Sequence, residues 1–339
     1  MLCKAVLVGA GHSLPEKTVT CEELEASMGF DKLNLRKGMA KLLSGVSERR
    51  IAKSGTNSSD LAVEAANMAL AQAGMKADEV ELVIFAAVSQ DLIEPATVNI
   101  VMDKAQIRNA KGIDVKNACN AFLSSIEIAN MYIKCGNVKN VLIVSGEVLS
   151  TYVKMDFTNI EELKNITSTF SVGDAGGAIV LKAEESTNQN NNIQKRFLSF
   201  PDTWLDGALL GGGTMYPRDP EMMYAQNEAR EMMKLNFKRA IEFYVDSFRQ
   251  LKINYDEVSL FIPPQITKYL VMQVVESLKL PMDRTVCHVG TLGNISSAAF
   301  PVALSMAMCD GRLTIGSGQR VVCLGAANGF SAGLLYMAV

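Results

Sequence analysis

Residues Gly112–Ser125 read GIDVKNACNAFLSS, in which a strand pattern gives way directly to a long apolar helical pattern over Ala121–Ile133. The stretch therefore predicts a strand-to-helix corner with Cys119 at the start of the helix. A thiol at that place lies near the positive end of the helix dipole and near free backbone N–H groups, which favour the thiolate and can stabilise an oxyanion. On these residues alone, Cys119 is either a nucleophile or an inert packing thiol.

The order of elements around this corner occurs twice in the chain. In the first half, apolar and helical patterns predict a strand at 80–88, a helix near 96–106, the corner at 113–134 and a strand at 141–145. In the second half, they predict a strand at 258–262, a helix near 266–279, a corner at 285–309 and a strand at 321–324. Strands that alternate with helices predict an α/β fold with largely parallel sheets. The pattern indicates an internal duplication with Cys119 and Asn294 at equivalent corners; the alternative is the general similarity of successive βα units.

Composition limits the class of protein. The chain has 339 residues, of which 48% are hydrophobic, so it can build two domains or one duplicated domain. Lys and Arg (33) nearly balance Asp and Glu (36) without a long basic tract, which gives no indication of nucleic acid or anionic lipid as a partner. There is no secretory signal pattern and no stretch of roughly 18 apolar residues, so we expect a cytoplasmic protein.

The cysteines are odd in number and lack metal-site spacing: Cys3, Cys21, Cys119, Cys135, Cys287, Cys309 and Cys323. In a reducing compartment we expect free thiols, most of them packed in the core. With only two histidines and no Cys/His cluster, no metal site is predicted.

Several spaced motifs together resemble the thiolase superfamily, and within it the β-ketoacyl-ACP synthase III (3-oxoacyl-ACP synthase III) condensing enzymes. DVKNACNAF resembles the nucleophile motif Asp-Val-x-x-Ala-Cys-x-Gly-Phe, with Ala121 in place of the glycine. LGNISSAAFPVAL is similar to Tyr-Gly-Asn-Thr-Ser-Ala-Ala-Ser-Ile-Pro-x-Ala-Leu. The resemblance runs almost end to end through GAGHSLPEKTVT, SGVSERRIA, SSDLAVEAANMAL, VGDAGGAIVL and GAANGFSAG.

The resemblance implies a five-layered αβαβα fold made of two similar halves, here 1–182 and 183–339, and a homodimer. It implies that Cys119 accepts an acyl group from acyl-CoA or an acyl carrier protein, and that a second substrate then takes that group. Asn294 would donate to the carbonyl of the second thioester. Backbone N–H groups of Cys119 and of the 325–330 loop, with Gly329 as the candidate, would form the oxyanion hole.

One family residue is missing. The family has a catalytic histidine in a Pro-His-Gln motif, whereas this chain reads Pro263-Pro264-Gln265. Proline has no donor or base, so Pro264 cannot replace the imidazole. His288 is one candidate for a relocated imidazole, although its place on a strand favours a structural histidine bonded to backbone. Alternatively, the acceptor is an alcohol, amine or thiol, or a substrate that needs no decarboxylation.

Two further expectations concern partners. The family's CoA-stacking tryptophan is absent, which favours a carrier protein over CoA as donor. Carrier proteins are acidic, so Lys238, Arg239 and Lys268 are candidate docking residues; solvated helix charges are the alternative. No permanently bound cofactor is expected. The function predicted is acyl transfer in fatty-acid-like or secondary-metabolite biosynthesis; the alternative is a non-catalytic or partly degenerate subunit of a heteromeric ketosynthase.

Overall fold

The computed structural model describes residues 2–339 except 156, 158, 160, 161, 163–166, 187–192, 206 and 226–229. Its first half is built on a five-stranded sheet in the order β1-β7-β6-β4-β5. The strands are β1 (Leu2–Ser13), β4 (Leu82–Ala86), β5 (Lys111–Val115), β6 (Asn140–Val148) and β7 (Asp174–Ser186). β4 pairs in parallel with β5 and β6, whereas β7 runs antiparallel to β1 and β6.

The second half repeats this arrangement in the order β8-β11-β10-β9. Its strands are β8 (Ile193–Ser199), β9 (Val258–Ile262), β10 (Arg320–Ala327) and β11 (Ser331–Ala338). The predicted strand before GNISS is reduced to a single bridge between Phe261 and Thr285, at the place that β5 has in the first sheet. The matching strand orders confirm the predicted duplication. The predicted boundary after residue 182 falls inside β7, because β1 pairs with that strand as far as Ser186.

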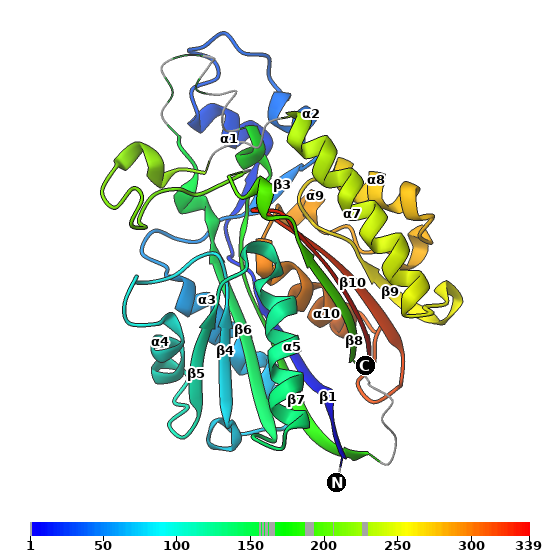
Figure 1. Cartoon of the computed structure of the whole chain (residues 1–339). Helices are drawn as coiled ribbons and strands as arrows, with labels where there is room; N and C mark the ends of the chain where they lie inside the picture. Colours follow the sequence, from blue (N-terminus) through cyan, green and yellow to red (C-terminus); the bar gives the residue numbers. More distant parts are fainter. Residues whose placement is uncertain are drawn as a thin grey trace.

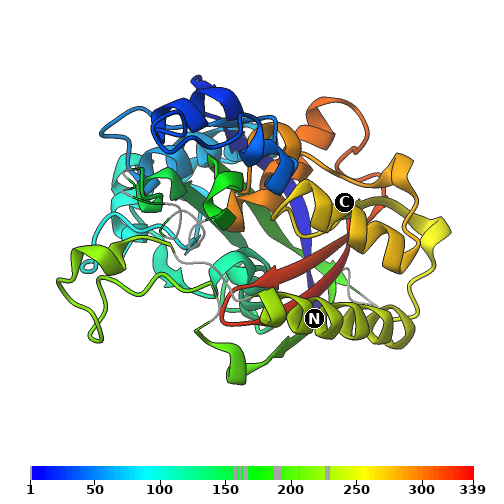
Figure 2. The same cartoon turned by 90° about the horizontal axis from the view of Figure 1, so that it is seen from above.

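Helices separate and cover the two sheets (Figures 1 and 2). α3 (Ser58–Ala73) and α4 (Thr97–Lys104) pack on the outer face of the first sheet. α5 (Ala121–Lys134) and α10 (Ala299–Cys309) lie between the sheets, and α7 (Arg230–Gln250) and α8 (Lys268–Leu278) cover the second sheet. The five-layered αβαβα fold is therefore confirmed. None of the described helices combines the length and apolarity that a membrane crossing needs.

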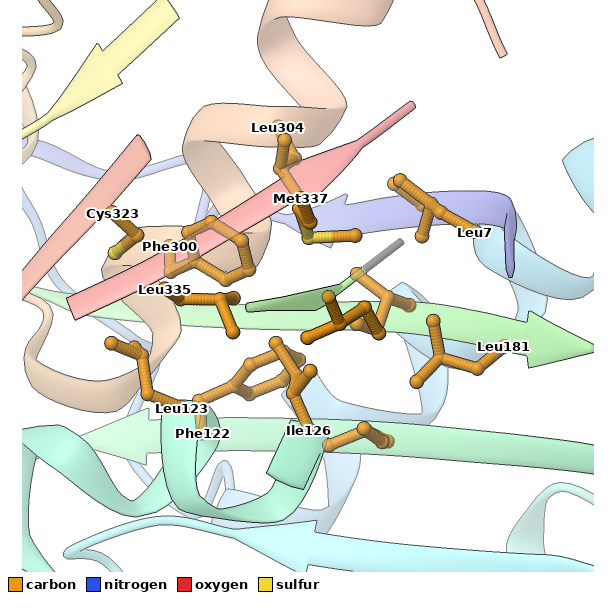
Figure 3. Close-up of a cluster of buried hydrophobic side chains, with 14 of the residues drawn as sticks. Leu7, Phe122, Leu123, Ile126, Leu181, Phe300, Leu304, Cys323, Leu335 and Met337 are labelled. Atoms are coloured by element: carbon orange, nitrogen blue, oxygen red, sulfur yellow. The ribbon is translucent and has the colours of Figure 1, made fainter. Parts of the chain in front are cut away.

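The central layer fixes the two corner helices (Figure 3). Phe122 and Ile126 of α5, with Phe300 of α10, belong to one buried cluster that includes residues of both sheets. The rings of Phe122 and Phe300 have centroids 6.2 Å apart. Burial of large apolar side chains on both helices makes the start of each helix a rigid position.

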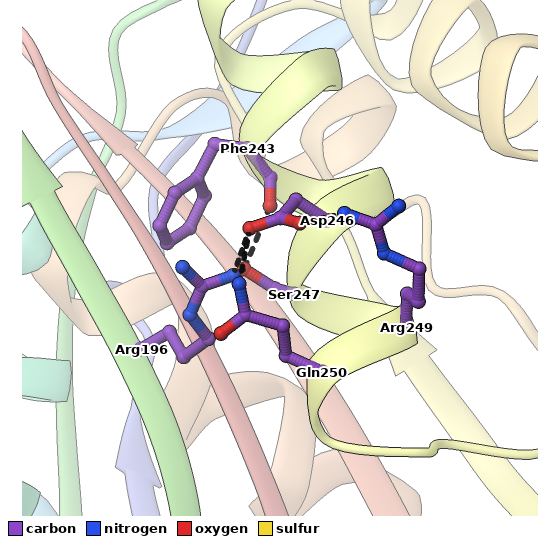
Figure 4. A network of polar contacts seen from close by, with 6 residues as sticks. All are labelled: Arg196, Phe243, Asp246, Ser247, Arg249 and Gln250. Atoms are coloured by element: carbon purple, nitrogen blue, oxygen red, sulfur yellow. Dashed lines mark hydrogen bonds and ion pairs between the residues drawn. The ribbon is translucent and has the colours of Figure 1, made fainter.

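A polar network fastens the outer helix α7 to the edge strand β8 (Figure 4). Arg196 Nη1 donates to Asp246 Oδ2 at 2.7 Å and to Ser247 Oγ at 3.2 Å. Arg249 donates to the other carboxylate oxygen of Asp246. These two guanidinium groups lower the pKa of Asp246, so the carboxylate remains charged.

The glycines of VGDAGGAIVL allow close packing. A Cβ on Gly176 would lie 2.0 Å from the carbonyl oxygen of Leu61, and one on Gly177 would lie 2.6 Å from Pro301 Cγ. The carboxylate of Asp174, in the same motif, accepts from the backbone N–H groups of Ala52 and Ser150, at 2.8 and 2.9 Å.

Short elements complete the fold around the upper part of Figure 1. They are β2 (Thr18–Thr20), α1 (Cys21–Ser27), α2 (Met39–Ser44), β3 (Glu48–Arg50) and α9 (Val289–Leu292). β2 and β3 form a two-stranded antiparallel sheet. The sequence predicted that a strand runs into the corner at 285–309, and α9 lies in that place instead.

Candidate active site

Two equivalent corners face each other between the sheets. Cys119 lies in a 3₁₀ turn over Ala118–Asn120 that continues into α5, and a matching turn over Ser296–Ala298 continues into α10. The first residue of each turn has a positive φ, 45° at Ala118 and 47° at Ser296. Ser297 therefore has the place of Cys119, and the predicted equivalence with Asn294 is wrong by a few residues. Hydrophobic patterns locate a corner but do not fix its register.

Two of the three predicted catalytic residues line one small cavity of about 30 Å³. Cys119 and Asn294 contribute to its wall with Pro264, Ser296 and Ser297. Pro264 brings only its ring and backbone to this wall. Gln265 cannot stand in for an imidazole, since its Nε2 donates to the carbonyls of Pro263 and Val286 and its Oε1 accepts from Val289 N–H.

The thiol of Cys119 is protonated at neutral pH. Burial raises its pKa to about 11, although the Ser296 hydroxyl and the backbone N–H of Cys119 act in the opposite direction. The Ser296 hydroxyl donates to Cys119 Sγ at 3.2 Å. The charge of Glu147 raises the pKa further. The thiolate expected from the helix dipole is therefore not the resting form, because desolvation outweighs the favourable dipoles.

Asn294 is held by its backbone and by its amide oxygen. Its N–H donates to the carbonyl of Ser171 at 2.5 Å, and its carbonyl accepts from Gly173 N–H at 3.0 Å. Its Oδ1 accepts from Ser296 N–H at 3.0 Å. The side-chain amide therefore has its oxygen occupied, and its N–H₂ group is the part available to a substrate carbonyl.

A guanidinium supports the segment that holds Asn294. Arg49, only 1% exposed, donates from Nη2 to the carbonyl of Phe170 at 2.7 Å, next to Ser171. Its Nε and Nη1 have no hydrogen-bond partner among the described residues. The bond to Phe170 therefore orders the 3₁₀ turn over Thr167–Ser171, whose last carbonyl accepts from Asn294 N–H.

A buried carboxylate lies behind the second corner. Glu147 is fully buried on β6 and accepts from the N–H groups of Val88 and Ser89, each at 3.0 Å. The Ser297 hydroxyl donates to it at 2.5 Å and also contacts Ser145 Oγ at 2.7 Å. Burial raises the pKa of Glu147, while these hydrogen bonds lower it.

His288 and Gly329 are not among the described residues that line the cavity. His288 precedes α9 and is 8% exposed, and neither of its ring nitrogens has a hydrogen-bond partner within the described part of the chain. Burial lowers its pKa to about 4, so the ring is neutral at neutral pH. Gly329 lies in the turn after β10, and the cavity wall from that region comes from Gly325 and Ala326.

The three candidate docking residues differ in their surroundings. Arg239 pairs with Asp202 at 2.7 Å and lies over the ring of Phe200, 5.0 Å from its centroid. Lys238 keeps 73% of its side chain exposed. Lys268 begins α8 and is exposed. Both lysines are exposed, although Lys238 Nζ also lies 3.9 Å from Glu242 Oε1 on the same helix, whereas Arg239 is held by both Asp202 and Phe200.

Sequence analysis missed Ser296, Ser297 and Glu147. The two serines stand in the motif that identified Asn294, and Glu147 is the one acidic residue in the apolar run of β6. A charge in a buried strand is a signal of a buried polar network, and it was available in the sequence.

Comparisons with known proteins identify the family and the fold. The family model for 3-oxoacyl-[acyl-carrier-protein] synthase III matches residues 113–198, and its C-terminal model matches 248–339. A Listeria monocytogenes β-ketoacyl-[acyl-carrier-protein] synthase III is 30% identical over 98% of this chain and 97% of its own length. This chain belongs to the 3-oxoacyl-[acyl-carrier-protein] synthase III family. It is therefore a condensing acyltransferase.

Two solved structures share the thiolase-like fold of this synthase III family member. OleA of Xanthomonas campestris, with bound lauric acid and lauroyl-CoA, has a TM-score of 0.87 at 22% identity, with 99% of each chain covered. Aquifex aeolicus 3-oxoacyl-[acyl-carrier-protein] synthase III has a TM-score of 0.82 at 24% identity, covering 99% of this chain and 100% of its own.

Proposed function

We propose that Cys119 takes an acyl group from an acyl-CoA or acyl carrier protein and passes it to a second substrate, in fatty-acid-like or secondary-metabolite biosynthesis. The observation that carries this proposal is that Cys119 and Asn294 line one cavity at the start of a buried helix. A nucleophile and a carbonyl-directed amide in one enclosed space are what two-step acyl transfer needs.

In the first step, the Cys119 sulfur attacks the thioester carbonyl carbon and the donor thiol leaves with one proton. The backbone N–H of Cys119, at the start of the turn into α5, is the proposed donor to the oxyanion. Gly325 and Ala326 line the cavity, which makes their segment a better candidate for a second donor than Gly329. The acyl group arrives as a thioester, so the step needs no resident cofactor.

In the second step, the N–H₂ group of Asn294 orients the carbonyl of the acceptor. Decarboxylation of a malonyl thioester is normally supported by an imidazole as well, and Pro264 occupies that place in the wall. An acceptor that needs no decarboxylation is therefore the better fit to this cavity. The choice between carbon–carbon condensation and transfer to an alcohol, amine or thiol is set by that acceptor.

The test is incubation with acyl-CoA and with acyl carrier protein, followed by intact-protein mass measurement. We expect one acyl adduct in the wild type and none in Cys119→Ala. An adduct that persists in Cys119→Ala refutes the covalent mechanism. A malonyl-thioester decarboxylation assay on the wild type and on His288→Ala then tests the relocated imidazole: unchanged decarboxylation in the variant removes His288 from the reaction.

A second candidate function follows from Pro264: the chain is a non-catalytic subunit of a heteromeric ketosynthase. Co-purification with a related chain that carries an intact Cys-His-Asn set, together with no acyl adduct on this one, would favour it. We otherwise propose a cytoplasmic homodimer, to be checked by light scattering. Lys238 and Lys268 are the proposed contacts for an acidic carrier protein, and Lys→Glu variants of both should weaken carrier binding.

A further inference from the structure

The reacting sulfur has a specific neighbour. Ser296 Oγ lies 3.2 Å from Cys119 Sγ, and it comes from the other half of the chain, 177 positions away. Ser296 is held from two directions, because its N–H donates to Asn294 Oδ1 and its backbone enters the turn into α10. Its hydroxyl is therefore fixed beside the thiol.

Acyl transfer to this thiol requires that a proton moves. The resting sulfur carries its proton, and the donor thiol must leave with one. Of the described residues that line the cavity, only the cysteines Cys119 and Cys323 are titratable, and Cys323 is buried on β10. Glu147, whose charge acts on Cys119, is bonded to Ser297 rather than to the sulfur.

We propose that the hydroxyl of Ser296 relays the proton from Cys119 to the leaving sulfur of the acyl donor. This proposal rests on the proposed function. The Cys119 S–H bond breaks and its proton goes to Ser296 Oγ, while the original hydroxyl proton goes to the leaving sulfur. The bond from Cys119 sulfur to the acyl carbon forms, and the bond to the leaving sulfur breaks. Charge and protons balance, and no external base is used.

The geometry suits such a transfer. In the tetrahedral intermediate both sulfurs are bonded to one carbon, so a hydroxyl within hydrogen-bond distance of one sulfur can reach the other. A hydroxyl is both a donor and an acceptor, which a relay requires. Ser296 therefore touches the reacting atoms and acts as a catalytic residue for the acylation step.

The decisive variant is Ser296→Ala, and the fold itself indicates that alanine is tolerated there. Ala118 occupies the equivalent first position of the other corner with φ 45°, against 47° at Ser296. Ser125→Ala is the matched control, since Ser125 is buried on α5 and donates only along the helix, to Ala121 O at 2.8 Å.

The experiment compares two reactions of Cys119 under single-turnover conditions, with intact mass as the readout. Acylation by an acyl-CoA needs a proton at the leaving sulfur, whereas alkylation by iodoacetamide releases iodide and needs none. We expect Ser296→Ala to slow acylation about 100-fold, the scale of general acid–base catalysis. Alkylation should slow by at most about tenfold, the effect of one lost hydrogen bond.

If Ser296→Ala slows acylation and alkylation by the same factor, Ser296 only donates a hydrogen bond that lowers the pKa of Cys119, and the relay is refuted. Unchanged acylation would overturn it as well. A solvent deuterium isotope effect that is larger for wild-type acylation than for alkylation is a second measurement that does not depend on the variant, because both reactions remove the Cys119 proton but only acylation also protonates the leaving sulfur; equal isotope effects would refute the relay. A wild type that forms no acyl adduct would instead refute the proposed function on which the relay rests.

Discussion

The resting state of Cys119 gives the sharpest prediction. With a pKa of about 11, the thiol ionises far above neutral pH. Only about 1 in 10,000 molecules then carries the thiolate at pH 7, because each pH unit below the pKa lowers its fraction tenfold. Alkylation of Cys119 by iodoacetamide should therefore rise about tenfold per unit from pH 7 to pH 10.

The assay is a pH series of short iodoacetamide exposures, with each cysteine quantified by peptide mass spectrometry. Cys135 and Cys309 are exposed free thiols in the same chain and provide internal standards for reagent and pH. An alkylation rate at Cys119 that levels off below pH 8 would mean that the helix dipole outweighs burial. That result would refute the desolvation argument and restore the thiolate predicted from sequence.

Three further changes test the surroundings of the site. Glu147→Gln removes the buried charge that raises the pKa of Cys119, so alkylation at pH 8 should be faster than in the wild type, with Glu127→Gln on α5 as the control. Pro264→His places an imidazole in the cavity wall, and malonyl-thioester decarboxylation should exceed that of Pro264→Ala. Arg49→Met breaks the bond to the Phe170 carbonyl and should slow acyl transfer about tenfold. The free energy of unfolding should change by no more than about 2 kcal/mol, because the substitution also removes two buried donors, Nε and Nη1, that have no partner among the described residues.

The elements predicted from sequence are those with a strong period or a continuous apolar run. β9 was predicted at its observed bounds, 258–262, because it is buried and β-branched. β8 was missed, since it is an edge strand with mostly half-exposed residues and lacks an apolar run. β1 was missed because it carries Gly9 and Gly11, which allow α3 to pack directly on the strand. A Cβ on Gly9 would lie 2.3 Å from the carbonyl oxygen of Ala69, and one on Gly11 would lie 2.2 Å from that of Ala65. Such glycines weaken the strand pattern for a reason that only the packed structure reveals.

The site divides in the same way. Cys119 was found from local sequence, because a strand followed by an apolar helix predicts a corner wherever it occurs. Its charge state was predicted wrongly, because the dipole argument uses the helix alone, whereas desolvation depends on everything packed around the sulfur. The contact with Ser296 joins residues 177 positions apart and has no local signature.

The duplication explains why a hydroxyl meets the thiol. Each half ends its corner in a short turn with a positive φ, followed by a buried helix, and the two helices pack together through Phe122 and Phe300. That packing brings the two turns to one cavity. Ser296, the first residue of its turn, therefore lies against Cys119, the second residue of the other turn. A side chain at position 296 is therefore directed at the nucleophile by the fold itself. Pro264 stands where the family has its catalytic histidine, so this chain has no imidazole at that place. Ser296 supplies a hydroxyl that can exchange protons, and the duplicated fold places it against the Cys119 sulfur.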